Sequence, residues 1–153
     1  MNQLSGEPIV DGKFCGTSCL GRTELNTSYP KLPFFFRPYL RWEGPGWGWF
    51  YRRLGIRGVD NTDPRWHHAP IRTTRGKWHG YRMKLDLSDD VQRRAFFLGR
   101  FYDLEILQLL DVLLKPGDTF IDVGANVGLI TLHAAWRVGE HGCVVAIEPN
   151  PNC

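Results

Sequence analysis

The clearest alternation of apolar and polar residues runs over residues 80–87, GYRMKLDL. Four apolar side chains point to one side of an extended chain: Tyr81, Met83, Leu85 and Leu87. The polar residues between them point to the other side, which is the pattern of a half-buried strand. We expect this strand to pair with residues 69–74, APIRTT, across a turn at Arg75 and Gly76.

Two helices are predicted to follow the strand. Ser88 is the expected N-cap of the first, whose opening turn carries Asp89 and Asp90, charges that a helix N-terminus favours. Asp103 is the expected cap of the second helix, over residues 104–114. The polar positions of this second helix form one narrow stripe: Glu105, Gln108, Asp111 and Lys115. The helix is therefore predicted to be buried on most sides and to end at the KPGD sequence that follows it.

A strand, a glycine turn, a helix and a second strand are predicted for the last part of the chain. Residues 119–123, TFIDV, are typical of a buried parallel strand. Residues 124–126 form a tight turn, and Val127 opens a helix that GEHG at 139–142 ends. Residues 143–148, CVVAIE, supply a second buried strand. This order predicts an α/β fold, with parallel strands joined by a right-handed crossover.

The region before this periodic part is expected to form an N-terminal arm, residues 1–69. Turn-forming residues without periodicity predict mobility over residues 1–30. Residues 31–79 combine aromatic residues, arginines and glycines, and two interpretations stay open: a surface for nucleic acid or anionic lipid, or an irregular arm whose rings cover the neighbouring domain. Residues 70–118 then form the hairpin and helices, and residues 119–153 begin the ligand-binding domain.

Composition narrows the class of protein. The 153 residues carry a net charge of +3, but residues 1–79 hold 12 Lys and Arg against 6 Asp and Glu, and the remainder holds 7 against 10. The four cysteines (Cys15, Cys19, Cys143 and Cys153) and the histidines do not have the spacing of a metal site, so none is expected. No apolar run is long enough for a signal sequence or a membrane span, so we expect a cytoplasmic protein.

The glycine turn and the strand ends carry the candidate chemistry. The dinucleotide fingerprint needs glycines at positions 0, +2 and +5, where this chain has Gly124, Asn126 and Leu129. Asp122, two residues before the first glycine, would repel a pyrophosphate and suits a positively charged ligand such as S-adenosylmethionine. Glu148, at the tip of the second strand, is placed to bind ribose hydroxyls.

The sequence FIDVGANVG, followed by VVAIEPNP, resembles motifs I and II of class I S-adenosylmethionine-dependent methyltransferases. The lead-in GRFYDLEILQLLDVLLKPGD and the EPNP ending are most similar to the FkbM type, and the resemblance covers residues 80–152. It implies a Rossmann-like fold and seven cofactor-binding residues: Asp122, Gly124, Ala125, Asn126, Gly128, Glu148 and Pro149. In this set Gly124 and Gly128 line the methionine portion, Asp122 lies near its amino group, Glu148 holds the ribose and Pro149 lies beside the adenine. The resemblance also brings Tyr102 and Glu105 toward the cofactor, but neither is assigned.

The resemblance implies methylation of a hydroxyl oxygen on a sugar or secondary metabolite. The family's domain continues with five further strands, so we expect this chain to be a fragment that carries the front half of the cofactor site. No catalytic residue is assigned, and His133 is expected to be a plain surface or boundary residue. An open sheet edge predicts self-association. The alternative hypothesis is a non-catalytic interaction protein that binds a partner, anionic lipid or nucleic acid through its arm.

Overall fold

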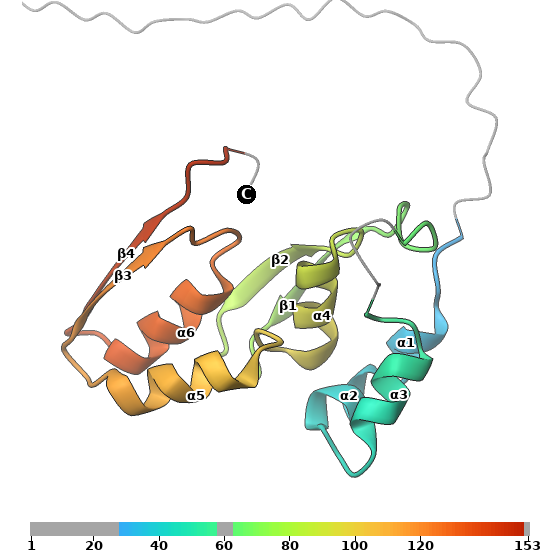
Figure 1. Ribbon diagram of the computed structural model, residues 1–153, viewed down its shortest axis with the longest axis horizontal. Coiled ribbons are helices and arrows are strands. Elements are labelled where there is room, and N and C mark those ends of the chain that lie inside the picture. Colours follow the sequence, from blue (N-terminus) through green and yellow to red (C-terminus); the bar gives the residue numbers. More distant parts are fainter. Residues whose placement is uncertain (1–27, 58–62, 152–153) are drawn as a thin grey trace, which may run out of the picture.

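The computed structural model describes residues 28–57 and 63–151 and has a mixed α/β fold with two small sheets (Figure 1). The elements, in chain order, are α1 (Leu32–Phe35), α2 (Arg37–Trp42), α3 (Trp47–Arg53), β1 (Ile71–Arg75), β2 (Arg82–Asp86), α4 (Asp90–Leu98), α5 (Leu104–Leu113), β3 (Thr119–Val123), α6 (Leu129–Val138) and β4 (Cys143–Ile147). The prediction of mobility over residues 1–30 concerns mainly residues 1–27, which lie outside the described residues. Such an α/β arrangement is compatible with part of a Rossmann-like fold.

The predicted hairpin is confirmed, with a broader turn than expected. β1 and β2 pair antiparallel in a register that runs from Ile71 opposite Asp86 to Arg75 opposite Arg82. The backbone N–H of Gly76 donates to the carbonyl of Tyr81 at 3.0 Å, so the turn extends over residues 76–81. Three of the four predicted inward residues are buried, whereas Tyr81 is exposed because it belongs to this turn and precedes β2.

The cap of α4 is Asp89 and not Ser88. The Asp89 carboxylate accepts the N–H of Gln92 at 2.8 Å, the bond expected of an N-cap side chain. The Ser88 hydroxyl instead donates to the carboxylate of Asp86 at 2.7 Å, so it is not available to the helix. The predicted cap of α5 is confirmed, because the Asp103 carboxylate accepts the N–H of Glu105 at 3.2 Å.

The parallel pair at the end of the chain is confirmed. β3 and β4 pair from Thr119 opposite Cys143 to Val123 opposite Ile147, and α6 packs along one face of both strands (Figure 1). The helix begins at Leu129, two residues later than predicted. Gly128 has φ +76, a left-handed conformation that cannot be part of a right-handed helix. The helix therefore begins after Gly128, and Val127 remains in the loop.

Burial of α5, β3 and β4 is less complete than the apolar pattern predicts. On α5 only Leu107 and Leu110 are buried, and Val112 is 79% exposed. On β3, Ile121 and Val123 face away from α6, and Val123 is 77% exposed. An apolar pattern indicates which face of a helix or strand could be buried. Whether that face is buried depends on another element that covers it. Within the described residues, helices cover one face of the β3–β4 pair and not the other.

Several rings of the arm belong to the main hydrophobic core. Leu40, Tyr51, Ile56 and Trp66 form one buried cluster with residues of β2 and α4. The Phe34 ring lies 5.2 Å from the Phe97 ring, centroid to centroid. The described part of the arm contains three short helices, so it is not irregular as expected, but side chains from it do cover the neighbouring elements, as the second interpretation of its composition holds.

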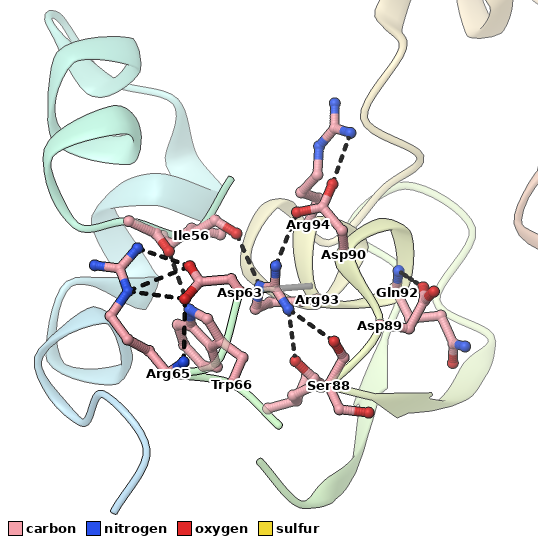
Figure 2. A network of polar contacts seen from close by, with 12 residues as sticks. Ile56, Asp63, Arg65, Trp66, Ser88, Asp89, Asp90, Gln92, Arg93 and Arg94 are labelled. Carbon is pink, nitrogen blue, oxygen red and sulfur yellow. Dashed lines mark hydrogen bonds and ion pairs between the residues drawn. The ribbon is translucent and has the colours of Figure 1, made fainter. Parts of the chain in front are cut away.

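A buried arginine joins three segments of this core, as Figure 2 shows. Arg93 of α4 is 1% exposed, and its guanidinium donates to the carbonyls of Ile56, Leu87 and Ser88 at 2.8–3.1 Å. It also donates to the carboxylate of Asp90 at 2.8 Å. The arm, the end of β2 and the start of α4 are thereby fixed to one side chain.

Candidate functional site

A pocket of about 220 Å³ lies where β3 ends and the chain turns into α6. Its lining residues come from α4, from the connection between α4 and α5, and from the end of β3 through the first turn of α6: Val91, Phe101, Tyr102, Asp122, Gly124, Ala125, Asn126, Val127, Leu129 and Ile130. Four of the seven predicted cofactor-binding residues are in this set. The carboxyl end of a parallel strand is the usual position for a ligand in an α/β unit.

Asp122 sets the charge of the pocket. Among the described residues that line it, Asp122 is the only one with a charged side chain, and it is 9% exposed. One carboxylate oxygen accepts the hydroxyl of Thr131 at 2.5 Å, which holds the side chain between β3 and the first turn of α6. An ionised carboxylate in such a place attracts cations and repels phosphates.

The backbone N–H groups of the glycine turn are satisfied within the protein. Those of Gly124 and Ala125 both donate to the carbonyl of Ile147, at 2.8 and 3.1 Å. The next three donate to the Glu148 carboxylate, to the side-chain oxygen of Asn126 and to the carbonyl of Ala125. A phosphate-binding loop points its N–H groups at the anion. Because all five N–H groups from residue 124 to residue 128 donate internally, this loop does not have that geometry.

Glu148 closes the turn from the side of β4. One of its carboxylate oxygens accepts the N–H of Asn126 at 2.8 Å, and the other accepts the N–H of Asn150 at 2.8 Å. A carboxylate has about four acceptor positions, so each oxygen retains capacity for a further donor such as a ribose hydroxyl. Glu148 is half-buried beside the pocket but is not one of its lining residues.

The other two predicted residues lie at the margin of the site. Gly128 is the N-cap of α6, and a Cβ built on it would lie 3.8 Å from the Thr131 side chain. Its backbone conformation shapes the turn, although the residue does not line the pocket. Pro149 is exposed, follows Glu148 directly and is likewise not among the lining residues.

One wall of the pocket was not assigned from the sequence, although the resemblance brought Tyr102 toward the cofactor. Phe101 and Tyr102 line it with ring centroids 4.6 Å apart, together with Val91 of α4. The guanidinium of Arg94 lies 3.5 Å from the Tyr102 ring centroid, and the same group pairs with Asp90. The sequence signal for this wall was the pair of consecutive aromatic residues between two predicted helices, because rings in a short connection usually pack against a neighbouring element.

His133 is not a surface residue. It is 2% exposed, its Nε2 lies 2.9 Å from a carboxylate oxygen of Asp111 on α5, and its ring contacts those of Trp78 and Trp136. It is not one of the residues that line the pocket. The helical pattern did place it near a boundary, but the pairing with Asp111 across two helices is not visible in sequence.

The volume, charge and lining of the pocket can be compared with those that S-adenosylmethionine would need. Ligand sites that hold a whole drug-sized molecule are about 300–1,000 Å³, so this pocket is smaller than such a site. Its negative charge suits the sulfonium and amino groups, and its apolar and aromatic walls suit a hydrocarbon chain or a base. The carboxylates of Asp122 and Glu148 can accept hydrogen bonds, and the amino group and ribose hydroxyls of the cofactor can donate them.

Comparison with known proteins supports a methyltransferase relationship of a general kind. Ribosomal RNA large subunit methyltransferase E of Chromohalobacter salexigens is 49% identical to the chain over 47 residues. That match covers 31% of this chain and 22% of the relative, so the chain spans less than a quarter of the relative's length. No protein-family profile and no solved structure match the chain. Within the part of the chain that the structure describes, no helix has the length and apolar character needed to cross a bilayer.

Proposed function

We propose that the pocket at the end of β3 binds S-adenosylmethionine and that the chain is part of a methyltransferase that uses it. The observation that carries this proposal is the polarity of the site. A buried carboxylate faces the pocket, while the N–H groups of the glycine turn are occupied within the protein. Such a site provides acceptors and negative charge, which a cationic nucleoside matches and a dinucleotide does not.

Each residue has a distinct part in this proposal. Asp122 accepts from the amino group of the methionine portion, and Gly124 and Ala125 let that portion approach the backbone. Glu148 accepts from the ribose hydroxyls while it holds the turn through Asn126. Pro149 lies next to the adenine. When bound, the cofactor supplies a methyl group activated by the positive sulfonium.

The acceptor is proposed to be a hydroxyl oxygen on a sugar or secondary metabolite, as the FkbM resemblance implies. The relative named above acts, by its name, on ribosomal RNA, so RNA is the competing acceptor class. Incubation with labelled cofactor and either a sugar library or total RNA would separate the two. Label in the small-molecule fraction supports the first, and label in RNA overturns it.

Exposed rings on the arm favour a second candidate function. Phe35 is 82% exposed, and Trp42 and Trp49 are also exposed, close in sequence to the exposed Arg52 and Arg53. Aromatic side chains with arginines are suited to nucleic acid, anionic lipid or a partner protein. A non-catalytic interaction protein would use this surface and would not need the pocket.

Calorimetric titration with S-adenosylhomocysteine tests the cofactor proposal directly. We expect saturable binding to the full chain, weakened by about 1–3 kcal/mol in Asp122→Asn and in Glu148→Gln, because each variant removes a charged acceptor. Glu140→Gln, at an exposed position after α6, removes the same charge away from the site and should bind as the unchanged protein does. A folded protein that shows no saturable heat, or site variants that match the Glu140→Gln control, would overturn the proposal.

A further inference from the structure

The aromatic wall of the pocket is built on an arginine that does not itself line it. Phe101 and Tyr102 lie shortly after the end of α4, and Arg100 directly precedes them. The Arg100 guanidinium donates to the carbonyl of Phe101 at 2.7 Å and to that of Tyr102 at 3.1 Å. Arg100 is buried, so water cannot replace these bonds readily. The backbone of the wall is therefore fixed by one side chain.

Arg100 is in turn fixed from the arm. Its guanidinium makes two parallel bonds to Glu43 at the end of α2, at 2.9 and 2.7 Å, and Lys77 donates to the same carboxylate. Two-point pairing of this kind restricts orientation as well as distance. Burial alone would raise the pKa of Glu43, but the hydrogen bonds and charges of Arg100 and Lys77 outweigh it and hold that pKa below its usual value.

Glu43 occupies an unusual backbone conformation. Its φ is +57, in the left-handed region that residues with a side chain adopt only at a cost of about 1–2 kcal/mol. This unfavourable backbone conformation occurs at the residue whose carboxylate pairs with Arg100 and Lys77. Glu43 and Arg100 are 57 residues apart in sequence, so the bond joins the arm to the pocket region.

We infer that Arg100 is a positioning residue for the cofactor, and that Glu43 makes binding depend on the arm. Arg100 sets the position of Phe101 and Tyr102 through their carbonyls, and Glu43 holds Arg100 in the one orientation that reaches both. The arm helix α2 then helps to position the wall of the pocket, in addition to packing in the hydrophobic core. The inference rests on the proposed function for the ligand, although the ordering of the wall is a property of the protein alone.

Two variants and one matched control separate this role from general stability. Arg100→Lys keeps the charge but cannot span two carbonyls and two carboxylate oxygens. Glu43→Gln keeps the shape and removes the charge. Arg37→Lys is the control, because Arg37 also joins α2 to α4, through the carbonyl of Phe96 at 3.2 Å, and does not bond to the pocket wall.

The experiment measures affinity for S-adenosylhomocysteine by calorimetry and backbone hydrogen exchange over residues 99–105, on the full chain below the unfolding transition. We expect about tenfold weaker binding and at least tenfold faster exchange in Arg100→Lys and Glu43→Gln, with both values unchanged in Arg37→Lys. Equal effects in the control, or unchanged exchange in Arg100→Lys, would overturn the inference. Faster exchange with unchanged affinity would also overturn it. If the unchanged protein does not bind the ligand, the proposed function and the cofactor role of Arg100 fail together, and only its ordering of the wall can stand, on the exchange data.

Discussion

Replacement of the buried arginine of α4 by methionine tests how the described elements are held together. Arg93→Met keeps a long side chain of similar reach and removes the guanidinium. The group makes its four hydrogen bonds to three segments: Ile56 of the arm, the Leu87–Ser88 connection and Asp90 of α4 (Figure 2). Burial lowers the pKa of Arg93, with Asp90 acting in the opposite direction, but an arginine remains charged at every ordinary pH.

The expected loss of stability follows from the groups left behind. Ile56 and Leu87 are fully buried, so their carbonyls would lose a charged donor that water does not replace, at about 1–3 kcal/mol each. Asp90 keeps a partner, because Arg94 bonds to its other oxygen at 3.1 Å. The methionine side chain recovers some apolar burial. Two such carbonyls together cost about 2–6 kcal/mol, and because the methionine offsets part of this we expect Arg93→Met to lose about 3–5 kcal/mol.

Urea unfolding followed by circular dichroism, together with a thermal melt, measures the effect. For a chain of this size the loss corresponds to a fall in Tm of about 6–20 °C. Arg82→Met is the control, because it removes a guanidinium from an exposed position on β2. It should change the free energy of unfolding by less than about 0.5 kcal/mol. A loss below about 1 kcal/mol in Arg93→Met would refute the reasoning, because the arginine would then be replaceable by any side chain of its size.

Two further variants test the pH response and the glycine turn. Burial raises the pKa of Tyr51 to about 12, from about 10 when unfolded, so its contribution to stability is complete below pH 10 and is lost as the pH rises to 12. Between pH 10 and pH 12 the free energy of unfolding should fall by about 2–3 kcal/mol more in the unchanged protein than in Tyr51→Phe. Parallel curves of unfolding free energy against pH for the two proteins would contradict this. Gly124 has φ +83 with open space around a built Cβ, so Gly124→Ala should cost about 1–2 kcal/mol from backbone strain alone, measured by urea unfolding; an unchanged midpoint would show that the turn relaxes.

Local signals in the sequence were sufficient for most of the elements. The alternation over residues 80–87 gave β2, and the apolar run at 119–123 with the glycines after it gave β3 and the turn. Both are cases in which side-chain period and turn chemistry agree. The start of α6 and the cap of α4 were each missed by one or two residues. These boundaries depend on the left-handed Gly128 and on the Ser88 bond to Asp86, and periodicity does not record either.

The candidate site was predicted in part for a similar reason. Asp122 and the turn residues lie within a few positions of one another, so a local motif describes them. The opposite wall, with Phe101 and Tyr102, comes from another segment, and its support at Glu43 lies 57 residues before Arg100. Contacts between distant segments depend on how the elements pack. A charged residue such as Arg93 or Arg100 also looks like a surface residue until its partners are known.

The choice of ligand depends on which polar groups the turn leaves available. A glycine turn before a helix can present its N–H groups to a phosphate, and sequence alone argued against this through Asn126 and Leu129. Hydrogen bonding gives an independent argument, since Ile147 and Glu148 take up the first N–H groups of the turn. What then faces the ligand is the carboxylate of Asp122, with spare acceptor capacity on Glu148. The proposed cofactor matches such groups, because its amino group and ribose hydroxyls are donors and its sulfonium and amino group are positively charged.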